Sequence, residues 1–378
     1  MQFKSRLIHA GTSRDPFTGA SSVPVYLAST FDQRAPRVTD AYDYTRSGNP
    51  TRESLEQAAA ELEKGAVGLA FASGMAAISS VLLLFQPGDH LLVGTDVYGG
   101  TFRILTTLFR RWGLHADFVD STRQEAVNAA LRPDTRGIIV ESPSNPLLKI
   151  TDLAFIAQLA AQRGILSIVD NTFCTPFLQR PLELGFDLAL HSATKFLNGH
   201  SDVLAGLAVA REKSLGEKLR RIQNAFGAVL GVQDSWLLLR GMKTLAVRME
   251  AGQAGAMFLA PKLAALPGVR RVHYPGLPEH PGKAVHDLQA SGPGAVLSFE
   301  LESPEAVGRF LRRVTLPLVS VSLGGVESIL SHPATMSHAA MPPEERAARG
   351  ISDALVRLSV GLEHPEDLWA DIRQALAA

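Results

Sequence analysis

A lysine that follows two hydroxyl residues is the most informative feature of the sequence. Within residues 191–200 (HSATKFLNGH), Ser192 and Thr194 lie two positions apart and precede Lys195. The hydroxyls could donate hydrogen bonds to phosphate oxygens, and a desolvated lysine could bond an aldehyde carbon and then act as a base. A lone lysine after a strand is usually an exposed residue without a chemical role. This motif therefore indicates a site only if other segments of the chain supply further residues for the same chemistry.

An aspartate closes a buried-strand pattern earlier in the chain. Residues 166–170 (LSIVD) form a mainly apolar run that ends in Asp170. In open α/β sheets ligands bind beyond the carboxyl ends of the strands, and an acid there could cap a helix, ligate a metal or pair with a cationic ring nitrogen. Because a lysine Schiff base and an aspartate at the pyridinium nitrogen recur in pyridoxal chemistry, Asp170 and Lys195 together favour a pyridoxal site.

Two further loops fit the same chemistry. Ser73, Gly74 and Met75 form a small-residue turn before an apolar helix, where backbone N–H groups bind phosphate well. Tyr98, within residues 96–101 (DVYGGT), could stack on a planar cofactor. Each loop alone could be a plain turn or simple packing. Together the four segments stand in order at the ends of expected strands and predict an enzyme that uses pyridoxal 5′-phosphate (PLP).

The elements that must position these residues alternate between apolar runs and amphipathic helices. Strands are expected at 67–71, 90–93, 117–119, 137–141, 166–170, 187–191 and 204–210. They lack clean polar alternation, as expected for strands covered on both faces, and so predict an open, mostly parallel α/β sheet. Asn49 and Pro50 begin a helix as N-cap and first helical residue. A long helix is expected from about 233 to 259.

The chain is expected to divide into three parts. Residues 1–48 are an extended arm, 49–245 the large cofactor-binding domain and 246–378 a smaller α+β domain. In the small domain the pattern predicts a strand from about 296, a glycine-rich loop at 323–325, a strand at 355–362 and a terminal helix from Pro365.

Composition excludes several other classes. The 378 residues carry 37 basic and 37 acidic side chains, so nucleic acid and anionic membranes are not expected partners. Cys174, the single cysteine, allows no disulfide framework, and no metal site is expected, since His191 and His200 fit no helical zinc pair. The start lacks the apolar core of a signal peptide, and the default is a cytoplasmic enzyme.

The sequence resembles the Cys/Met-metabolism family of PLP-dependent enzymes, which includes cystathionine γ-synthases, γ- and β-lyases, methionine γ-lyases and homoserine-ester sulfhydrylases. The similarity covers nearly the whole chain and is densest at residues 44–51, 187–201, 240–245 and 357–363. It implies the type I, aspartate aminotransferase-like fold of PLP-dependent transferases, with a mostly parallel large-domain sheet and a smaller α+β domain. It also implies a homotetramer built from two active dimers.

The resemblance assigns roles to individual residues. Lys195 would carry the cofactor as a Schiff base and move protons, Asp170 would pair with the ring nitrogen, and Tyr98 would stack on the ring and protonate the leaving sulfur. The phosphate of the cofactor would be bound by Ser73, Gly74, Met75, Ser192 and Thr194. Tyr44 and Arg46, from the arm, would reach the phosphate bound to the neighbouring subunit. Asn145, Ser322 and Arg357 would hold the substrate α-carboxylate, with Arg103 available for a distal carboxylate.

Single positions narrow the expected substrate. Ser47 stands where succinylhomoserine synthases carry Arg, and Gly100 stands where methionine γ-lyases carry Cys. These two residues weaken the assignment of the chain to either class of enzyme. Val321 replaces the Glu of yeast and animal cystathionine γ-lyases. The resemblance implies γ-elimination of L-cystathionine to cysteine, 2-oxobutanoate and ammonia. γ-Replacement on acetylhomoserine and γ-lysis of methionine or homocysteine stay as alternatives, as does a regulator without turnover.

Overall fold

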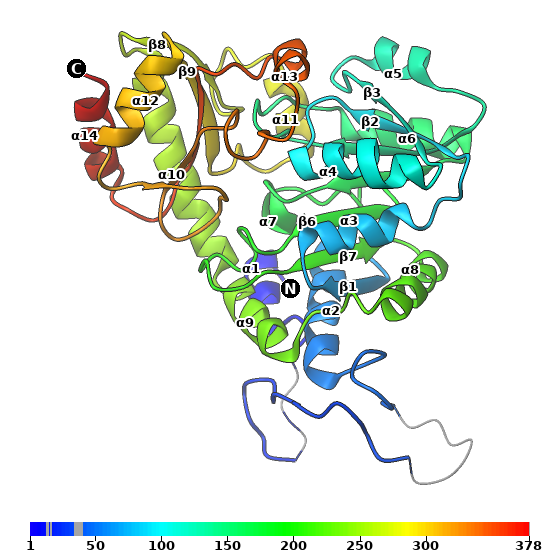
Figure 1. The fold of residues 1–378 in the computed structure, drawn as a ribbon. Coiled ribbons are helices and arrows are strands. Elements are labelled where there is room, and N and C mark those ends of the chain that lie inside the picture. Colours follow the sequence, from blue (N-terminus) through cyan, green and yellow to red (C-terminus); the bar gives the residue numbers. More distant parts are fainter. Residues whose placement is uncertain (13–14, 16, 34–40, 378) are drawn as a thin grey trace.

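The computed structural model describes residues 1–12, 15, 17–33 and 41–377, which form two β-sheets with their covering helices (Figure 1). The larger sheet has seven strands in the order β1-β7-β6-β5-β4-β2-β3. Its strands are β1 (Val67–Phe71), β2 (His90–Gly94), β3 (His115–Val119), β4 (Thr135–Glu141), β5 (Leu166–Asp170), β6 (Leu188–Ser192) and β7 (Gly206–Ala210).

The seven strands expected from the sequence are confirmed in number and order within this part of the chain. β7 runs antiparallel to β1 and β6, and the other neighbours are parallel, so the sheet is mostly parallel as predicted. Successive residues of β5 show why the apolar runs do not alternate. Ile168 packs into the core on one face of the sheet and Val169 into the core on the other.

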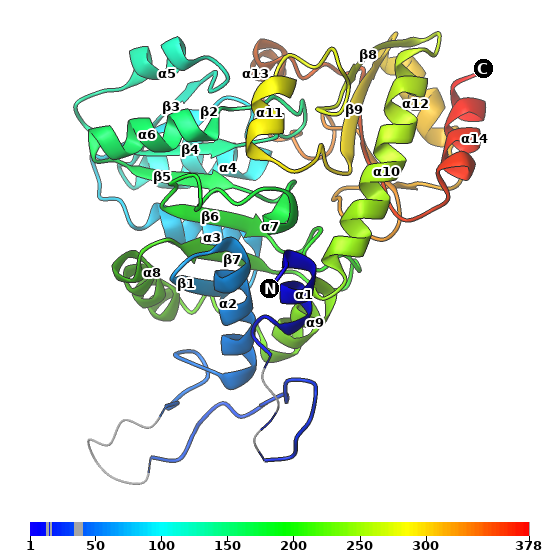
Figure 2. The ribbon, with the colours of Figure 1, turned by 180° about the vertical axis from the view of Figure 1, so that it is seen from behind.

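Helices cover both faces of this sheet (Figures 1 and 2). They are α2 (Pro50–Glu63), α3 (Gly74–Leu82), α4 (Gly99–Ile104), the π-helix Leu105–Phe109, α5 (Gln124–Ala130), α6 (Leu153–Arg163), α7 (Thr175–Leu178) and α8 (Lys213–Phe226). The apolar sides of α2 and α6 share one core, and those of α3 and α4 share the other. Asn49 caps α2 by accepting a hydrogen bond from Thr51 N, and Pro50 opens the helix, as expected.

The second sheet has five strands in the order β10-β11-β12-β9-β8. They are β8 (Val269–His273), β9 (Val296–Leu301), β10 (Leu318–Val319), β11 (Ile329–Ser331) and β12 (Leu355–Ser359). The remaining helices of the chain are α9 (Val232–Met242), α10 (Leu245–Ala264), α11 (Lys283–Gln289), α12 (Pro304–Arg313), α13 (Pro343–Arg349) and α14 (Pro365–Leu376). Of these, α9 packs on α2, and its apolar side lies in a core of the first sheet. Phe299 and Phe310 meet edge to face inside this third core, with ring centroids 5.7 Å apart.

Three local expectations were wrong. The helix expected at 233–259 is two helices, α9 and α10, because Thr244 leaves helical geometry between them. The strand expected at 355–362 ends at Ser359. The arm begins with a short helix, α1 (Phe3–His9), that the sequence pattern did not indicate.

The domain limits at 48/49 and 245/246 stay predictions. The arm passes through positions 13–14, 16 and 34–40, which lie outside the described residues. Figure 1 shows its described portions extending below α2, away from the second sheet. Among the described residues, no helix is both long enough and apolar enough to span a bilayer.

Candidate active site

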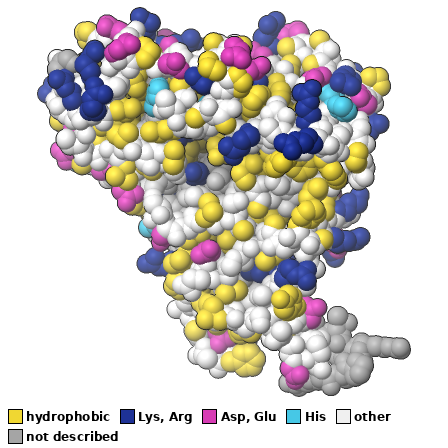
Figure 3. Space-filling model, viewed as in Figure 1, with side chains coloured by type: hydrophobic (Ala, Val, Ile, Leu, Met, Phe, Trp, Pro, Cys, Tyr) yellow, Lys and Arg dark blue, Asp and Glu magenta, His cyan; other side chains and the backbone are white. Residues whose placement is uncertain are grey.

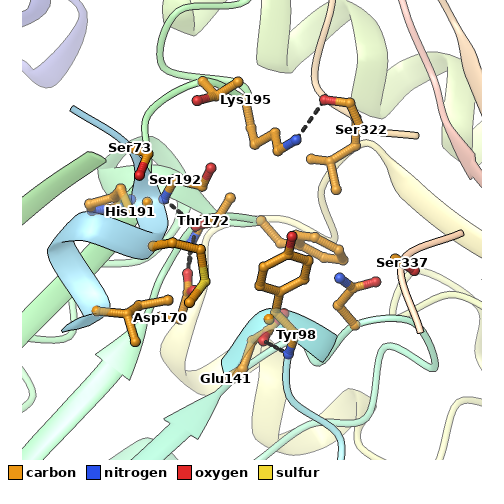
Figure 4. Close-up of a pocket in the computed structure, with 18 of the residues that line it drawn as sticks. Ser73, Tyr98, Glu141, Asp170, Thr172, His191, Ser192, Lys195, Ser322 and Ser337 are labelled. Carbon is orange, nitrogen blue, oxygen red and sulfur yellow. Dashed lines mark hydrogen bonds between the residues drawn. The ribbon is translucent and has the colours of Figure 1, made fainter. Parts of the chain in front are cut away.

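A cavity of about 370 Å³ lies where the two sheets meet. Figure 3 shows the surface hollowed on this face, and Figure 4 shows the lining side chains converging. The cavity brings together every residue predicted for the site except the two from the arm: Ser73, Gly74, Met75, Tyr98, Arg103, Asn145, Asp170, Ser192, Thr194, Lys195, Ser322 and Arg357. The first sheet supplies its strand ends, and the second supplies β12 and the loop before β11.

Lys195 lies on the turn between β6 and β7 and points into the cavity. Its Nζ donates a hydrogen bond of 2.6 Å to Ser322 Oγ. Burial, followed by the positive charge of Arg357, lowers the pKa of the Lys195 amine to about 8. A substantial fraction of this amine is therefore neutral near pH 7, as a nucleophile or a base requires.

Asp170 ends β5 at the cavity, where Thr172 holds it in place. The backbone N–H and the hydroxyl of Thr172 both donate to Asp170 Oδ1, and the same hydroxyl accepts from Ser192 N at 2.8 Å. Within the described chain, every hydrogen bond given to Asp170 reaches Oδ1, which leaves Oδ2 for a donor in the cavity. Burial raises the pKa of Asp170 above its ordinary value. Sequence reasoning gave Thr172 no role, although it lies only two residues after Asp170.

Glu141 is a second carboxylate in the cavity that sequence reasoning missed. It ends β4 opposite Asp170 in the register of the sheet, and its Oε2 accepts the backbone N–H of Tyr98 at 2.9 Å. Burial and the neighbouring charge of Asp170 raise the pKa of Glu141 well above the ordinary range. The signal was an acid at the end of a strand, the same signal that identified Asp170.

The start of α3 forms a cradle lined by small groups. Ser73 caps the helix by accepting from Ala76 N at 3.0 Å, and Gly74 begins it. A Cβ on Gly74 would lie 3.0 Å from Ser192 Cβ, so glycine allows the β6 serine to sit against the helix start. The positive end of the helix and the Ser192 hydroxyl therefore face the same volume and could hold a phosphate.

Arg357, in the middle of β12, is 2 % exposed and faces the cavity. It donates through Nη1 to Asn145 Oδ1 at 2.8 Å and through Nη2 to Ser322 O at 2.6 Å. Its Nε has no partner in the described part of the molecule. Burial lowers the pKa of Arg357 to about 10, against the opposing influence of Glu141. A fixed, desolvated guanidinium of this kind suits a carboxylate.

The loop that carries Ser322 fits closely against the lysine turn. Ser322 adopts a φ of 91°, in the left-handed region that a serine rarely occupies. Gly324 has a φ of 76°, and a Cβ there would lie 2.6 Å from Phe196 N. Only glycine fits at this approach, so the expected glycine-rich loop serves to bring Ser322 to Lys195.

Three predicted cofactor residues have other contacts in the single chain. Thr194 exchanges hydrogen bonds with Ala205, receiving its N–H at 2.9 Å and donating to its carbonyl at 3.2 Å. Arg46 donates to Asn224, and its guanidinium lies 5.6 Å from the centre of the Tyr44 ring. Tyr44 and Arg46 are not among the residues lining the cavity, and their predicted reach into a neighbouring subunit stays a prediction.

The donors and acceptors of this cavity fit PLP. The α3 cradle could take its phosphate, Asp170 Oδ2 its protonated ring nitrogen and Lys195 its aldehyde carbon. No group of three His, Cys, Asp or Glu side chains in the described residues is placed to hold a metal ion. Cys174 is buried, and burial together with the charge of Glu63 raises its pKa, so it remains a thiol.

The comparisons with known proteins agree on the family of this chain. Residues 4–377 match the family model described as Cys/Met metabolism PLP-dependent enzyme. Cystathionine beta-lyase MetC of Bacillus subtilis (strain 168) is 57% identical over 373 residues, 99% of this chain and 96% of that protein. Cystathionine gamma-lyase of the same organism is 50% identical over 376 residues, 100% of this chain and 99% of that protein. The crystal structure of cystathionine gamma-lyase from Lactobacillus plantarum, complexed with L-serine, is 47% identical with a TM-score of 0.97, covering 100% of this chain and 99% of that chain.

Proposed function

The chain belongs to the Cys/Met metabolism family of PLP-dependent enzymes, and on that premise we propose that it cleaves a carbon–sulfur bond of L-cystathionine. The single observation that carries this proposal is the meeting of Lys195 and Arg357 on Ser322. The amine donates to the Ser322 hydroxyl and the guanidinium to its carbonyl. An amino acid held by its carboxylate at Arg357 would present its Cα to the lysine amine.

Arg357 binds and orients the substrate in this proposal. Its unpartnered Nε lies on a guanidinium that Asn145 and Ser322 hold in one orientation. A substrate carboxylate would supply the missing acceptor through a charge-assisted hydrogen bond. Arg103, on α4 at the cavity wall, makes no ion pair with any described residue and would face the distal carboxylate of cystathionine.

Lys195 would remove the proton from Cα and return protons to the product. Its pKa of about 8 lets the amine accept and release a proton near neutral pH. PLP, once bound, supplies an electron sink for the charge left when a bond at Cα breaks. Asp170 would keep a positive ring nitrogen in place, and the Tyr98 hydroxyl, at the cavity wall, would protonate the departing sulfur.

Two cleavage sites on cystathionine compete. The resemblance of the chain to bacterial lyases implies cleavage at Cγ, and the Bacillus subtilis γ-lyase at 50% identity supports it. The relative at 57% identity is named a β-lyase, which favours cleavage at Cβ as the second candidate. Both reactions use the same carboxylate grip and the same Cα proton removal, so the proposal at the level of a cystathionine lyase does not depend on the choice.

One assay tests the lyase proposal and the cleavage site together. Purified, PLP-loaded protein is incubated with L-cystathionine, and the keto acids and thiols are separated and identified. Cleavage at Cγ yields cysteine, 2-oxobutanoate and ammonia, whereas cleavage at Cβ yields homocysteine, pyruvate and ammonia. Lys195→Ala should abolish both, while Lys149→Ala, at a half-buried lysine outside this cavity, should retain them.

The proposal fails if neither keto acid forms from cystathionine. Cystathionine made from acetylhomoserine and cysteine would then identify the chain as a γ-replacement enzyme. Methionine and homocysteine belong in the same panel. A Cβ on Gly100 would lie 2.4 Å from Tyr98 Cε1, so the cysteine typical of methionine γ-lyases would displace the Tyr98 ring in this chain.

Assembly and location follow from the same premise. We expect a homotetramer of two active dimers, in which Tyr44 and Arg46 reach the neighbouring cavity, and a cytoplasmic location. Light scattering of the purified protein measures the first, and a stable, fully active monomer would contradict it.

A further inference from the structure

A buried carboxylate lies behind the candidate active site, on the opposite face of the sheet from the cavity. Glu63 is the last residue of α2 and is 1 % exposed, and its partners His191 and Asn171 are 2 % and 0 % exposed. None of the three was assigned a role in the chemistry described above. A buried carboxylate is costly unless it is fully paired, so its presence here calls for a physical reason.

Glu63 binds the ends of two neighbouring strands through one oxygen. Its Oε1 lies 2.6 Å from His191 Nε2 and 2.9 Å from Asn171 Nδ2. Because an amide N–H can only donate, Oε1 accepts from Asn171, and the same oxygen is hydrogen-bonded to the His191 ring. Oε1 is thus shared between the two strands, although its partners lie 108 and 128 residues away in the sequence.

Each partner of Glu63 is the neighbour of a residue in the cavity. Asn171 follows Asp170, and His191 precedes Ser192. Side chains alternate across a sheet, and Asp170 pairs with Leu190 in the register of β5 and β6. His191 is itself among the residues that line the cavity. The side chains of Asn171 and His191 nevertheless bind Glu63 of α2, while Asp170 and Ser192 point toward the cavity, so fixing the first pair fixes the direction of the second.

The same network reaches a third strand end. Gln179 Nε2 donates to Asn171 Oδ1 at 3.0 Å and to Ser142 O at 2.9 Å, and Asn171 Nδ2 donates to Gln179 O at 2.8 Å. Ser142 directly follows Glu141, which holds the backbone of Tyr98. The ends of β4, β5 and β6 are thereby connected, with Glu63 at one end of the chain of hydrogen bonds.

We propose that Glu63 is a positioning residue for the cofactor: it sets the relative placement of the groups that receive the PLP ring nitrogen and the PLP phosphate. The inference rests on the proposed function only in assigning those contacts to Asp170 and Ser192. Outer partners of metal ligands typically contribute 10- to 100-fold to affinity, and we expect a loss of the same order for PLP, roughly 10- to 100-fold in Kd, when Glu63 is replaced by Gln.

The test compares two buried carboxylates of the same helix. Glu63→Gln keeps the shape but removes the charge, and Glu56→Gln does the same at a carboxylate that binds Ala70 N and Arg220, away from the cavity. For each purified variant and the wild type, PLP affinity is measured by titration of the apoprotein, the visible circular dichroism of bound PLP reports its orientation, and thermal unfolding reports stability. His191→Gln provides a second perturbation of the same pair.

Glu63→Gln and His191→Gln should both weaken PLP binding and change the visible dichroism, whereas Glu56→Gln should lower only the unfolding temperature. If Glu63→Gln does not fold, the comparison of His191→Gln with Glu56→Gln decides. The inference is overturned if Glu63→Gln and His191→Gln bind PLP with the wild-type Kd and dichroism. It is also overturned if Glu56→Gln weakens PLP binding equally when each variant is measured the same number of degrees below its own unfolding temperature. A wild-type chain that took up no PLP would instead refute the proposed function.

Discussion

The lowered pKa of Lys195 predicts how the apoprotein takes up PLP as pH changes. Burial and the charge of Arg357 bring the pKa from the ordinary 10.5 to about 8. Only the neutral amine can attack the PLP aldehyde. At about pH 7 roughly one Lys195 amine in ten is neutral, against about three in ten thousand for an unperturbed lysine, a difference of ~300-fold.

The sign of the pH dependence follows directly. Deprotonation increases as pH rises, so the rate of PLP uptake should increase about tenfold per unit at low pH and level off above about pH 9. Stopped-flow mixing of apoprotein with PLP, followed by visible absorbance, gives this rate. The same PLP reacted with a lysine-containing peptide corrects for the titration of PLP itself.

A variant separates the two causes of the shift. Arg357→Gln removes the positive charge that, after burial, is the second cause of the lowered Lys195 pKa. The pH at which the uptake rate levels off should therefore rise, while Lys195 remains buried. The reasoning would be refuted by a corrected rate that still climbs about tenfold per unit above about pH 9, as an ordinary lysine requires. It would also be refuted if Arg357→Gln moved the levelling to lower pH.

Two substitutions test the substrate grip and the aromatic wall. Arg357→Lys loses the planar guanidinium that contacts Asn145 and Ser322. It should lower kcat/KM for cystathionine about 10- to 150-fold, the equivalent of about 1.5–3 kcal/mol. A fall of less than about threefold would contradict the assigned role. Gly100→Ala places a Cβ 2.4 Å from Tyr98 Cε1, and the displaced ring should lower kcat/KM about 10- to 100-fold. Its control is Gly308→Ala on α12, where the new Cβ approaches only Arg312 Nη1, at 3.4 Å, and activity should be unchanged.

The large sheet could be predicted because its signal is local. Apart from β3 at the edge, the strands are short, largely buried apolar runs. Asp170 and Ser192 end strands, and Ser73 and Lys195 follow strand ends within three residues. Elements bounded by local caps, such as the helix that begins at Pro50, were also predictable. The same locality explains why the predicted residues of the first sheet line one cavity, because parallel strands place their carboxyl ends at one edge of the sheet. Ser322 and Arg357 reach this cavity from the second sheet.

Features set by distant contacts could not be predicted. The apolar pattern runs through the break between α9 and α10, where Arg248 donates to Gly241 O at 2.8 Å and to Phe196 O beside the lysine turn. The Arg248 guanidinium thus replaces hydrogen bonds within a helix by hydrogen bonds to other parts of the fold. No residue next to the break has a type that would predict this replacement. The role inferred for Glu63 has the same origin, because its two partners lie more than a hundred residues away.

The hydrogen bond between Asn145 and Arg357 has a consequence for how such enzymes diverge. Asn145 follows a strand of the first sheet and Arg357 lies on the second, so neither hydrophobic core alone determines the spacing between amine and guanidinium. That spacing depends on α10, whose residues enter the cores of both sheets. Substitutions along α10, remote from any ligand, can therefore change turnover while every residue of the cavity stays the same, and relatives with identical cavities need not share a rate.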